Sequence, residues 1–96
     1  LLMLVAIPSA AQQDAWYAAM RKAESARQSG RMNEARQAYE DALRAAESDP
    51  ALATERAMAI GKRASLWHDV QRTREAESGY RAAIEILRRQ PASELV

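Results

Sequence analysis

Apolar and small side chains recur at intervals of three and four residues from Gln12 onward, which is the spacing of one face of an α-helix. Four such stripes follow one another, separated by glycine, proline or short polar stretches. The pattern therefore predicts four helices whose apolar faces form a common core. The expected core residues are, helix by helix, Trp16, Ala19, Ala23 and Ala26; Ala35, Tyr39, Ala42, Leu43 and Ala46; Ala53, Ala57, Ile60, Ala64 and Trp67; and Ala76, Tyr80, Ala83, Ile84 and Leu87.

Residues that start or end helices lie between these stripes. Gly30 follows the first stripe and tolerates the left-handed backbone of a helix end, and Asn33 is the expected cap of the second helix. Asp49 and Pro50 end the second helix and start the third, because the residue before proline avoids the helical region and proline suits a first turn. Pro91 interrupts the chain again. The four helices are therefore expected to form two consecutive antiparallel pairs.

An internal repeat of 41 residues relates the second expected helix to the fourth. Among twenty aligned positions, 31–50 against 72–91, six are identical and fall at helical core spacings. We therefore expect residues 12–49 and 50–90 to form two helical hairpins and residues 91–96 to be the truncated start of a third. The identical positions are Arg31 and Arg72, Glu34 and Glu75, Ala35 and Ala76, Tyr39 and Tyr80, Ala42 and Ala83, and Pro50 and Pro91; Leu43 is matched by Ile84.

The repeated residues resemble the tetratricopeptide repeat (TPR), whose second helix carries a small residue, an aromatic four positions later and alanine three further on. Ala35, Tyr39 and Ala42 fit this order, and so do their counterparts in the second hairpin. Ala23 and Ala64 match the small position of the first helix. The resemblance implies an all-α fold of antiparallel helix-turn-helix repeats, that is, part of an α-solenoid.

Two features depart from the usual repeat. The spacing is 41 residues where the family has about 34, but seven extra residues are close to two helical turns, one for each helix of a pair. Relatives with longer periods exist, and residues 74–84 look like the repeats of kinesin light chains. Gln71 stands where the first hairpin has its turn glycine.

Composition and charge exclude several classes of function. Lys and Arg number 14 and Asp and Glu 13, spread over both halves, so the net charge of +1 disfavours binding driven by nucleic-acid phosphates. The absence of cysteine excludes disulfides, thiolate metal sites and cysteine nucleophiles, and the single histidine excludes an all-histidine metal cluster within one chain. The chain is alanine-rich, which favours helix over a β-sandwich.

His68 and Asp69 form the one pair of residues with the look of a catalytic or metal site. Adjacent residues of a helix diverge by about 100°, so these side chains are expected to point apart on the surface. Phosphate-binding, zinc-protease and calcium-loop motifs do not occur in the sequence. We therefore expect no enzyme, no cofactor and no metal. Three pairs in the favourable order are expected to be solvated ion pairs: Glu40 and Arg44, Glu77 and Arg81, and Glu85 and Arg89.

The TPR resemblance implies that the first helix of each pair lines a concave groove for a partner peptide or helix. Met and Tyr side chains there would make apolar contacts, and Arg and Lys would attract an acidic segment. The carboxylate clamp of the family is not expected, because Asn33 is the sole asparagine and lies in the turn. The expected groove residues are Tyr17, Met20, Arg21, Glu24, Arg27 and Gln28 from the first hairpin and Met58, Lys62, Ser65, His68 and Asp69 from the second.

The leading hypothesis is thus a protein–protein interaction module of an exported scaffold or assembly protein. The alternatives are a structural, self-associating helical spacer and a repeat arm of a larger enzyme or transcriptional regulator. No nucleic acid and no stable membrane span are expected, since the apolar run of residues 1–7 is too short to cross a bilayer.

Residues 1–11 look like the remnant of an export signal peptide. Ser9 and Ala11 fit the small positions that a signal peptidase reads, which would make Gln12 the new N-terminus and the protein periplasmic or secreted. The alternative is that residues 1–7 end a preceding buried helix that Pro8 breaks, in a cytoplasmic protein.

Overall fold

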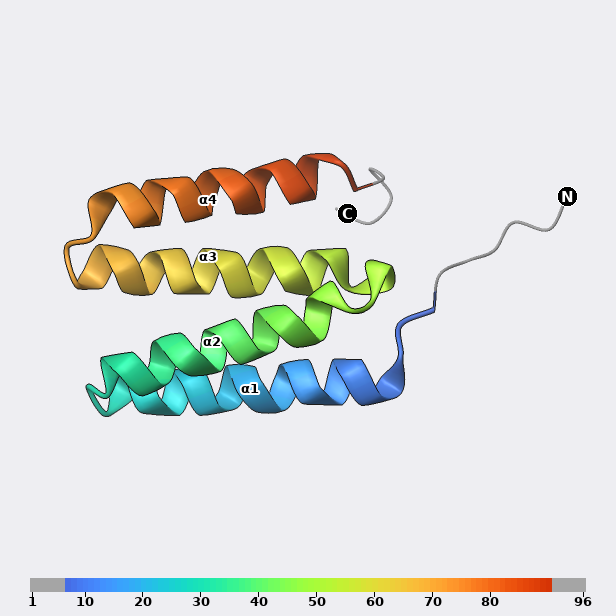
Figure 1. The fold of residues 1–96 in the computed structure, drawn as a ribbon, viewed down its shortest axis with the longest axis horizontal. Coiled ribbons are helices and arrows are strands. Elements are labelled where there is room, and N and C mark those ends of the chain that lie inside the picture. The colour runs from blue at the N-terminus through green and yellow to red at the C-terminus, as the bar shows by residue number, and fades with distance from the viewer. Residues whose placement is uncertain (1–6, 91–96) are drawn as a thin grey trace, which may run out of the picture.

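The computed structural model describes residues 7–90, and these form an all-α fold without strands in that range. The helices α1 (Ala10–Gln28) and α2 (Met32–Glu47) make one antiparallel hairpin, and α3 (Ala53–Asp69) and α4 (Thr73–Arg88) make another. The short 3-10 helix η1 (Pro50–Leu52) joins them, and the hairpins meet through α2 and α3 (Figure 1). The expected all-α fold of antiparallel helical hairpins is therefore confirmed, whereas residues 1–6 and the expected third unit at 91–96 lie outside the described residues.

The two hairpin turns have the same backbone geometry. After α1, the Arg31 amide donates to the Ala26 carbonyl at 2.8 Å, and after α3 the Arg72 amide donates to the Trp67 carbonyl at 2.7 Å. Each of these bonds closes a Schellman turn around one residue with positive φ: Gly30 at 76° and Gln71 at 63°. The equivalence of Gly30 and Gln71 that the repeat predicts is thus confirmed.

The starts of the helices follow the sequence in part. Asp49 caps η1, since its Oδ1 accepts the Ala51 amide at 3.0 Å, and Pro50 occupies the first turn as expected. The prediction that Asn33 caps α2 is wrong, because Arg31 is the N-cap residue and Asn33 lies inside the helix. The Schellman turn leaves one residue between Gly30 and Met32, so helical backbone resumes before Asn33 is reached.

Alanine and a few large side chains fill the core of the first hairpin. Tyr39 is fully buried, and Trp16 and Met20 are 4% and 8% exposed. Leu52 and Leu66, which the periodicity did not single out, are also buried and join this cluster from the second hairpin. The apolar faces of α1 and α2 therefore meet both each other and α3.

The second hairpin is less covered than the sequence predicts. Tyr80 and Ile84 were expected in the core, but they are 40% and 52% exposed. Their counterparts Tyr39 and Leu43 lie on a helix that has α1 on one side and α3 on the other. Within the described residues α4 packs mainly against α3 and has no helix on its other side, so the same positions remain open to solvent (Figure 1).

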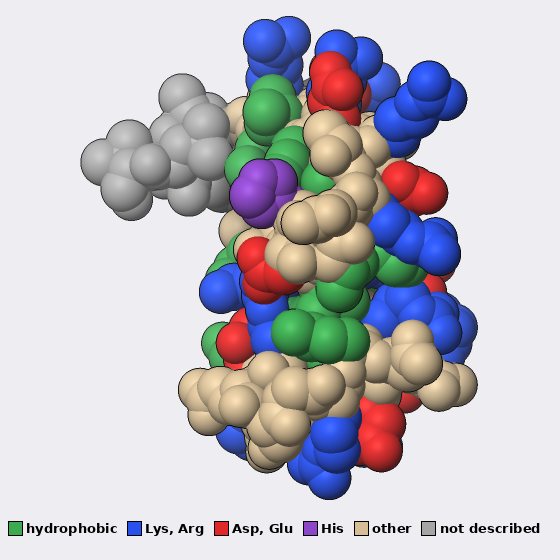
Figure 2. All heavy atoms as spheres, turned by 90° about the vertical axis from the view of Figure 1, so that its left-hand side faces the viewer, with side chains coloured by type: hydrophobic (Ala, Val, Ile, Leu, Met, Phe, Trp, Pro, Cys, Tyr) green, Lys and Arg blue, Asp and Glu red, His purple; other side chains and the backbone are tan. Residues whose placement is uncertain are grey.

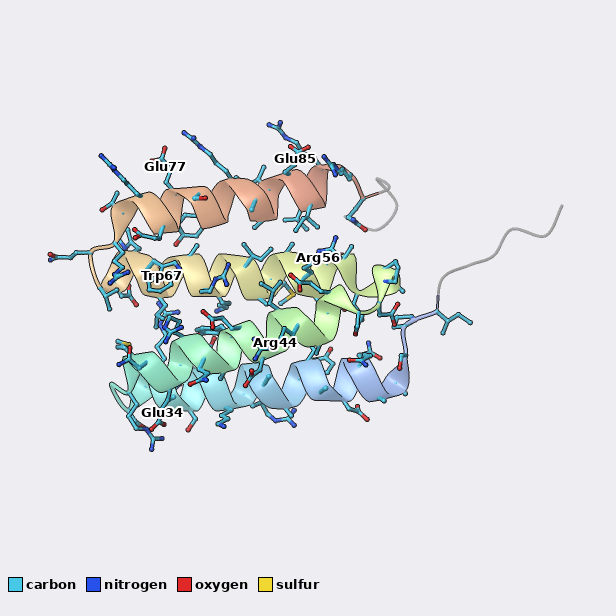
Figure 3. All side chains as sticks on the ribbon, in the orientation of Figure 1. Glu34, Arg44, Arg56, Trp67, Glu77 and Glu85 are labelled. Carbon is cyan, nitrogen blue, oxygen red and sulfur yellow. The ribbon has the colours of Figure 1, made fainter. Side chains whose placement is uncertain are left out.

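Ion pairs lie on the outer surface of the helices. Two of the three expected pairs form: Glu77 with Arg81 at 2.7 Å and Glu85 with Arg89 at 3.3 Å. Glu77 and Glu85 point away from the other helices (Figure 3). The third expected pair is replaced, because Glu40 pairs with Arg36 and Arg44 with Asp41. Exposed pairs of this kind contribute at most about 1 kcal/mol each.

Candidate partner-binding groove

A hollow of about 530 Å³ opens between α1 and α3. Trp16 and Met20 are nearly buried at its base, while Tyr17 and Met58 are 48% and 47% exposed. The rings of Trp16 and Tyr17 meet edge to face with centroids 4.9 Å apart. We call this hollow the groove; its lining residues are Trp16, Tyr17, Met20, Arg21, Glu24, Ser25, Gln28 and Met58.

Trp16 anchors the base of the groove. Its indole Nε1 donates to the backbone carbonyl of Glu55, in the first turn of α3, at 3.0 Å. The indole N–H is thereby satisfied, which lets the ring lie buried between the two helices. This bond fixes α1 against the start of α3 and holds Tyr17 and Met58 on opposite sides of the hollow.

Polar groups join α1, α2 and α3 beside the groove. Arg27 Nη2 donates to Ser65 Oγ at 2.9 Å and pairs with the Asp69 carboxylate. Glu24 Oε1 accepts the Tyr39 hydroxyl at 2.9 Å and lies 3.7 Å from Lys62 Nζ. These polar side chains therefore bind one another across the helices. We call the set of six, Glu24, Arg27, Tyr39, Lys62, Ser65 and Asp69, the interhelical network.

The interhelical network shifts two ionisation equilibria. Burial and the Glu24 carboxylate raise the pKa of the Tyr39 hydroxyl above its usual value, against the opposing effect of the Arg27 guanidinium. Burial works to lower the pKa of Arg27, but its interactions with Tyr39 and Asp69 outweigh that effect and leave it raised. Arg27 therefore stays charged and Tyr39 stays neutral at ordinary pH.

The structure divides the eleven expected groove residues into three groups. Six line the groove: Tyr17, Met20, Arg21, Glu24, Gln28 and Met58. Four are engaged in the interhelical network instead of facing solvent freely, namely Arg27, Lys62, Ser65 and Asp69. The His68 side chain is exposed and makes no hydrogen bond or ion pair with residues 7–90, while its neighbour Asp69 turns to α1.

Two residues that line the groove, Trp16 and Ser25, were not predicted from the sequence. Trp16 was assigned to the core alone, although a side chain of its size reaches both the core and the groove. Ser25 gave no signal because it is small and polar.

Arg21, at the rim, is exposed and has no acidic group within ion-pair distance in the part of the chain that the structure describes.

The other hollows are more polar. One of about 550 Å³ lies between α2 and the end of α3, close to Trp67 (Figure 3). The Arg72 guanidinium lies over the Trp67 ring there, 5.4 Å from its centroid. The end of the molecule that carries both hairpin turns shows acidic and basic side chains interspersed around exposed apolar ones (Figure 2). Residues 7–90 contain no group of three or more potential metal ligands, and none of their helices has the length and apolar character needed to cross a bilayer.

Comparisons of the chain with protein-family models, with curated proteins and with solved structures find no match. The function is therefore argued from the groove itself.

Proposed function

We propose that this chain is a non-catalytic protein–protein interaction module of TPR-like type that holds a partner segment in the groove. The observation that carries the proposal is the pair of half-exposed apolar side chains, Tyr17 from α1 and Met58 from α3, which line one hollow together with the buried Trp16 and Met20. A hollow of this kind suits one or two apolar side chains of an extended or helical peptide.

Charge at the rim defines the preferred partner. Lys62 and Arg27 are held by Glu24 and Asp69, so Arg21 is the cation of the groove left for an acidic residue of the partner. The proposed ligand is therefore a segment with an apolar anchor and a carboxylate close to it. Methionine in the lining adapts to anchors of different shape, which favours a range of related sequences over one.

Export to the periplasm or outside the cell is part of the proposal and rests on sequence alone. Most of the apolar run that suggests a signal peptide, residues 1–6, lies outside the described residues. The role that fits such a location is that of a scaffold or assembly factor, which binds its partner without a cofactor.

Selection from a peptide library, followed by affinity measurements on variants, tests the groove. Peptides selected on the unmodified chain should bind the Met58→Glu variant at least tenfold more weakly, because a charge replaces half of the apolar contact. Arg21→Glu should weaken acidic peptides by about fivefold, equivalent to roughly 1 kcal/mol for a rim charge.

Gln37→Glu provides the matched control, since Gln37 is exposed on α2 and does not line the groove. Selected peptides that bind all three variants equally would place the binding surface elsewhere and overturn the proposal. Loss of binding by Gln37→Glu as well would point to a general charge effect.

A further inference from the structure

The outer face of α4 carries large apolar side chains that nothing among residues 7–90 covers. Tyr80 and Ile84 are 40% and 52% exposed, whereas their counterparts 41 residues earlier, Tyr39 and Leu43, belong to the core around α2. Within the chain, α3 covers that face of α2 and adds Ala59 and Leu66 to the cluster that contains Tyr39. A helix with a small residue between larger contacts therefore fits such a face.

The helix α1 is the counterpart of α3 one repeat earlier, and its matching face is open as well. Ala18 corresponds to Ala59, Ala11 to Leu52 and Ser25 to Leu66, and all three residues of α1 are exposed. The bulky face of α4 and the small-residue face of α1 lie on opposite sides of the stacked hairpins (Figure 1). A shift of one repeat matches the open face of α4 with the covered face of α2. The same shift matches the open face of α1 with the face of α3 that covers α2.

We propose that a second copy of this chain docks head to tail, so that α1 of one copy packs on α4 of the other as α3 packs on α2 within a chain. The inference does not depend on the groove or on what binds there. The register is taken from the internal interface, where Met32 and Arg36 from the start of α2 and Leu66 and Val70 from the end of α3 line one hollow. The same register, shifted by one repeat, brings Ile84 opposite Ala18 of the second copy.

Charges agree with this register. It also brings Arg88 of one copy opposite Asp14 of the other, and neither residue forms an ion pair within residues 7–90. The equivalent positions of the internal interface hold two like charges, Glu47 and Glu55. The register therefore places opposite charges between copies at the positions where it places like charges within the chain, which favours a second copy as the occupant.

Tyr80 falls opposite Lys22 in the same register. The aliphatic stem of a lysine can cover a tyrosine ring while its ammonium group stays in water. Arg81 lies next to this position, but its guanidinium is already held by Glu77 at 2.7 Å. A head-to-tail contact leaves one open face at each end, so assembly is expected to continue beyond two copies.

Two variants that each block one face test the arrangement by sedimentation equilibrium of the full 96-residue chain. Ile84→Glu closes the α4 face and Ala18→Glu closes the α1 face; both positions are exposed, so the fold should persist, as circular dichroism will show. The unmodified chain, of 10.7 kDa, should increase in average mass with concentration, past two copies. Each variant alone should remain a monomer, and an equal mixture should form a complex of two chains and no larger.

Ala82→Glu is the matched control, because Ala82 is exposed on another side of α4, and it should assemble like the unmodified chain. Asp14→Arg and Arg88→Asp should each weaken association about fivefold, and together they should restore most of it. Dimers of Ala18→Glu alone would show that α4 pairs with itself and would overturn the head-to-tail contact. An unmodified chain that stays monomeric at about 1 mM would overturn any docking of a second copy.

Discussion

Tyr39 shows why polar residues beside the groove have a structural role. Its ring is fully buried, and its hydroxyl donates to Glu24 at the point where α1, α2 and α3 meet. Glu24 in turn faces Lys62 on α3. A buried hydroxyl without such a partner would be costly, so the position of Glu24 is tied to the packing of Tyr39 as well as to the groove.

Replacement of Tyr39 by phenylalanine should lower the free energy of unfolding by about 1 kcal/mol at neutral pH, because one hydrogen bond to a charged acceptor is lost. The folded-state pKa of Tyr39 is raised above its unfolded value. The stabilisation from the neutral hydroxyl is therefore complete below the unfolded pKa, near 10, and is lost as the pH rises through the folded pKa. The advantage of the unmodified chain over Tyr39→Phe should shrink above about pH 10.

Urea unfolding at neutral and at alkaline pH measures this difference. Tyr17→Phe is the control, because Tyr17 is half exposed and its hydroxyl makes no hydrogen bond with the described residues. A gap between the unmodified chain and Tyr39→Phe that is the same at both pH values would argue against a buried, neutral Tyr39.

Single residues were predictable from the sequence where the repeat constrains them. The 41-residue match pairs Gln71 with Gly30, and both adopt positive φ. Asn33 was wrongly predicted as the N-cap of α2, because the type of a residue does not show how many residues the preceding turn contains. Arg27 and Lys62 were placed at the groove, but their partners Asp69 and Glu24 could not be predicted, since such pairs depend on how far apart α1 and α3 lie.

At the scale of helices, α3 and α4 pack tightly against each other at Gly79. A Cβ atom added there would lie 2.8 Å from the Cβ of Ala64, which is closer than two carbon atoms can approach without movement. A Cβ added at Gly61, in the middle of α3, would lie 4.0 Å from the Cβ of Ala83, an ordinary contact. The two helical glycines thus differ in the space available, although both disfavour helix.

This difference predicts opposite effects of the same substitution. Gly61→Ala should raise the free energy of unfolding by roughly 0.5–1 kcal/mol, because alanine is the better helix former and fits the space. Gly79→Ala should lower it by about 1–3 kcal/mol, because overpacking against Ala64 outweighs the gain in helix propensity. Thermal unfolding of both variants checks the signs.

Ala64→Gly supplies the test of the cause. The cost of Gly79→Ala should be smaller in a chain that carries Ala64→Gly than in the unmodified chain, since the atom that clashes is then absent. Stabilisation by Gly79→Ala, equal to that by Gly61→Ala, would contradict the close approach of α3 and α4.

The periodicity predicted each helix and most of its buried face, because a helix needs little more than its own sequence to show which side is apolar. It could not predict whether that side is covered. Tyr39 and Tyr80 occupy equivalent positions, yet the first is buried and the second is 40% exposed. Burial depends on the neighbours, and among residues 7–90 α4 lacks a second neighbouring helix such as α2 has in α3.

On the scale of the whole molecule, Asp49 links the beginning of the chain to the junction of the hairpins. Its Oδ2 accepts the Ser9 amide at 2.6 Å, and its Oδ1 accepts the Ala51 amide in η1 at 3.0 Å. Ser9 is also the N-cap of α1, with its Oγ accepting the Gln12 amide at 3.4 Å. The segment assigned to an export signal therefore contributes contacts to the folded repeats.

Cleavage after Ala11, as the signal-peptide hypothesis predicts, would remove Ser9 and the first two residues of α1. A chain that begins at Gln12 should be less stable than the 96-residue chain by about 1–2 kcal/mol, from the lost cap and the lost bond to Asp49. For a domain of this size that corresponds to a melting temperature lower by about 4–8 °C per kcal/mol. In the full chain, Ser9→Ala should reproduce the loss of the cap alone, because the Ser9 backbone amide still reaches Asp49.

Asp49→Ala separates the two contributions. It should cost more in the 96-residue chain than in the chain that begins at Gln12, because Ser9 is present in the first alone. Equal costs in both chains would show that the contact between Ser9 and Asp49 adds no stability. The loss of stability on removal of residues 1–11 would then come from the lost cap of α1 alone.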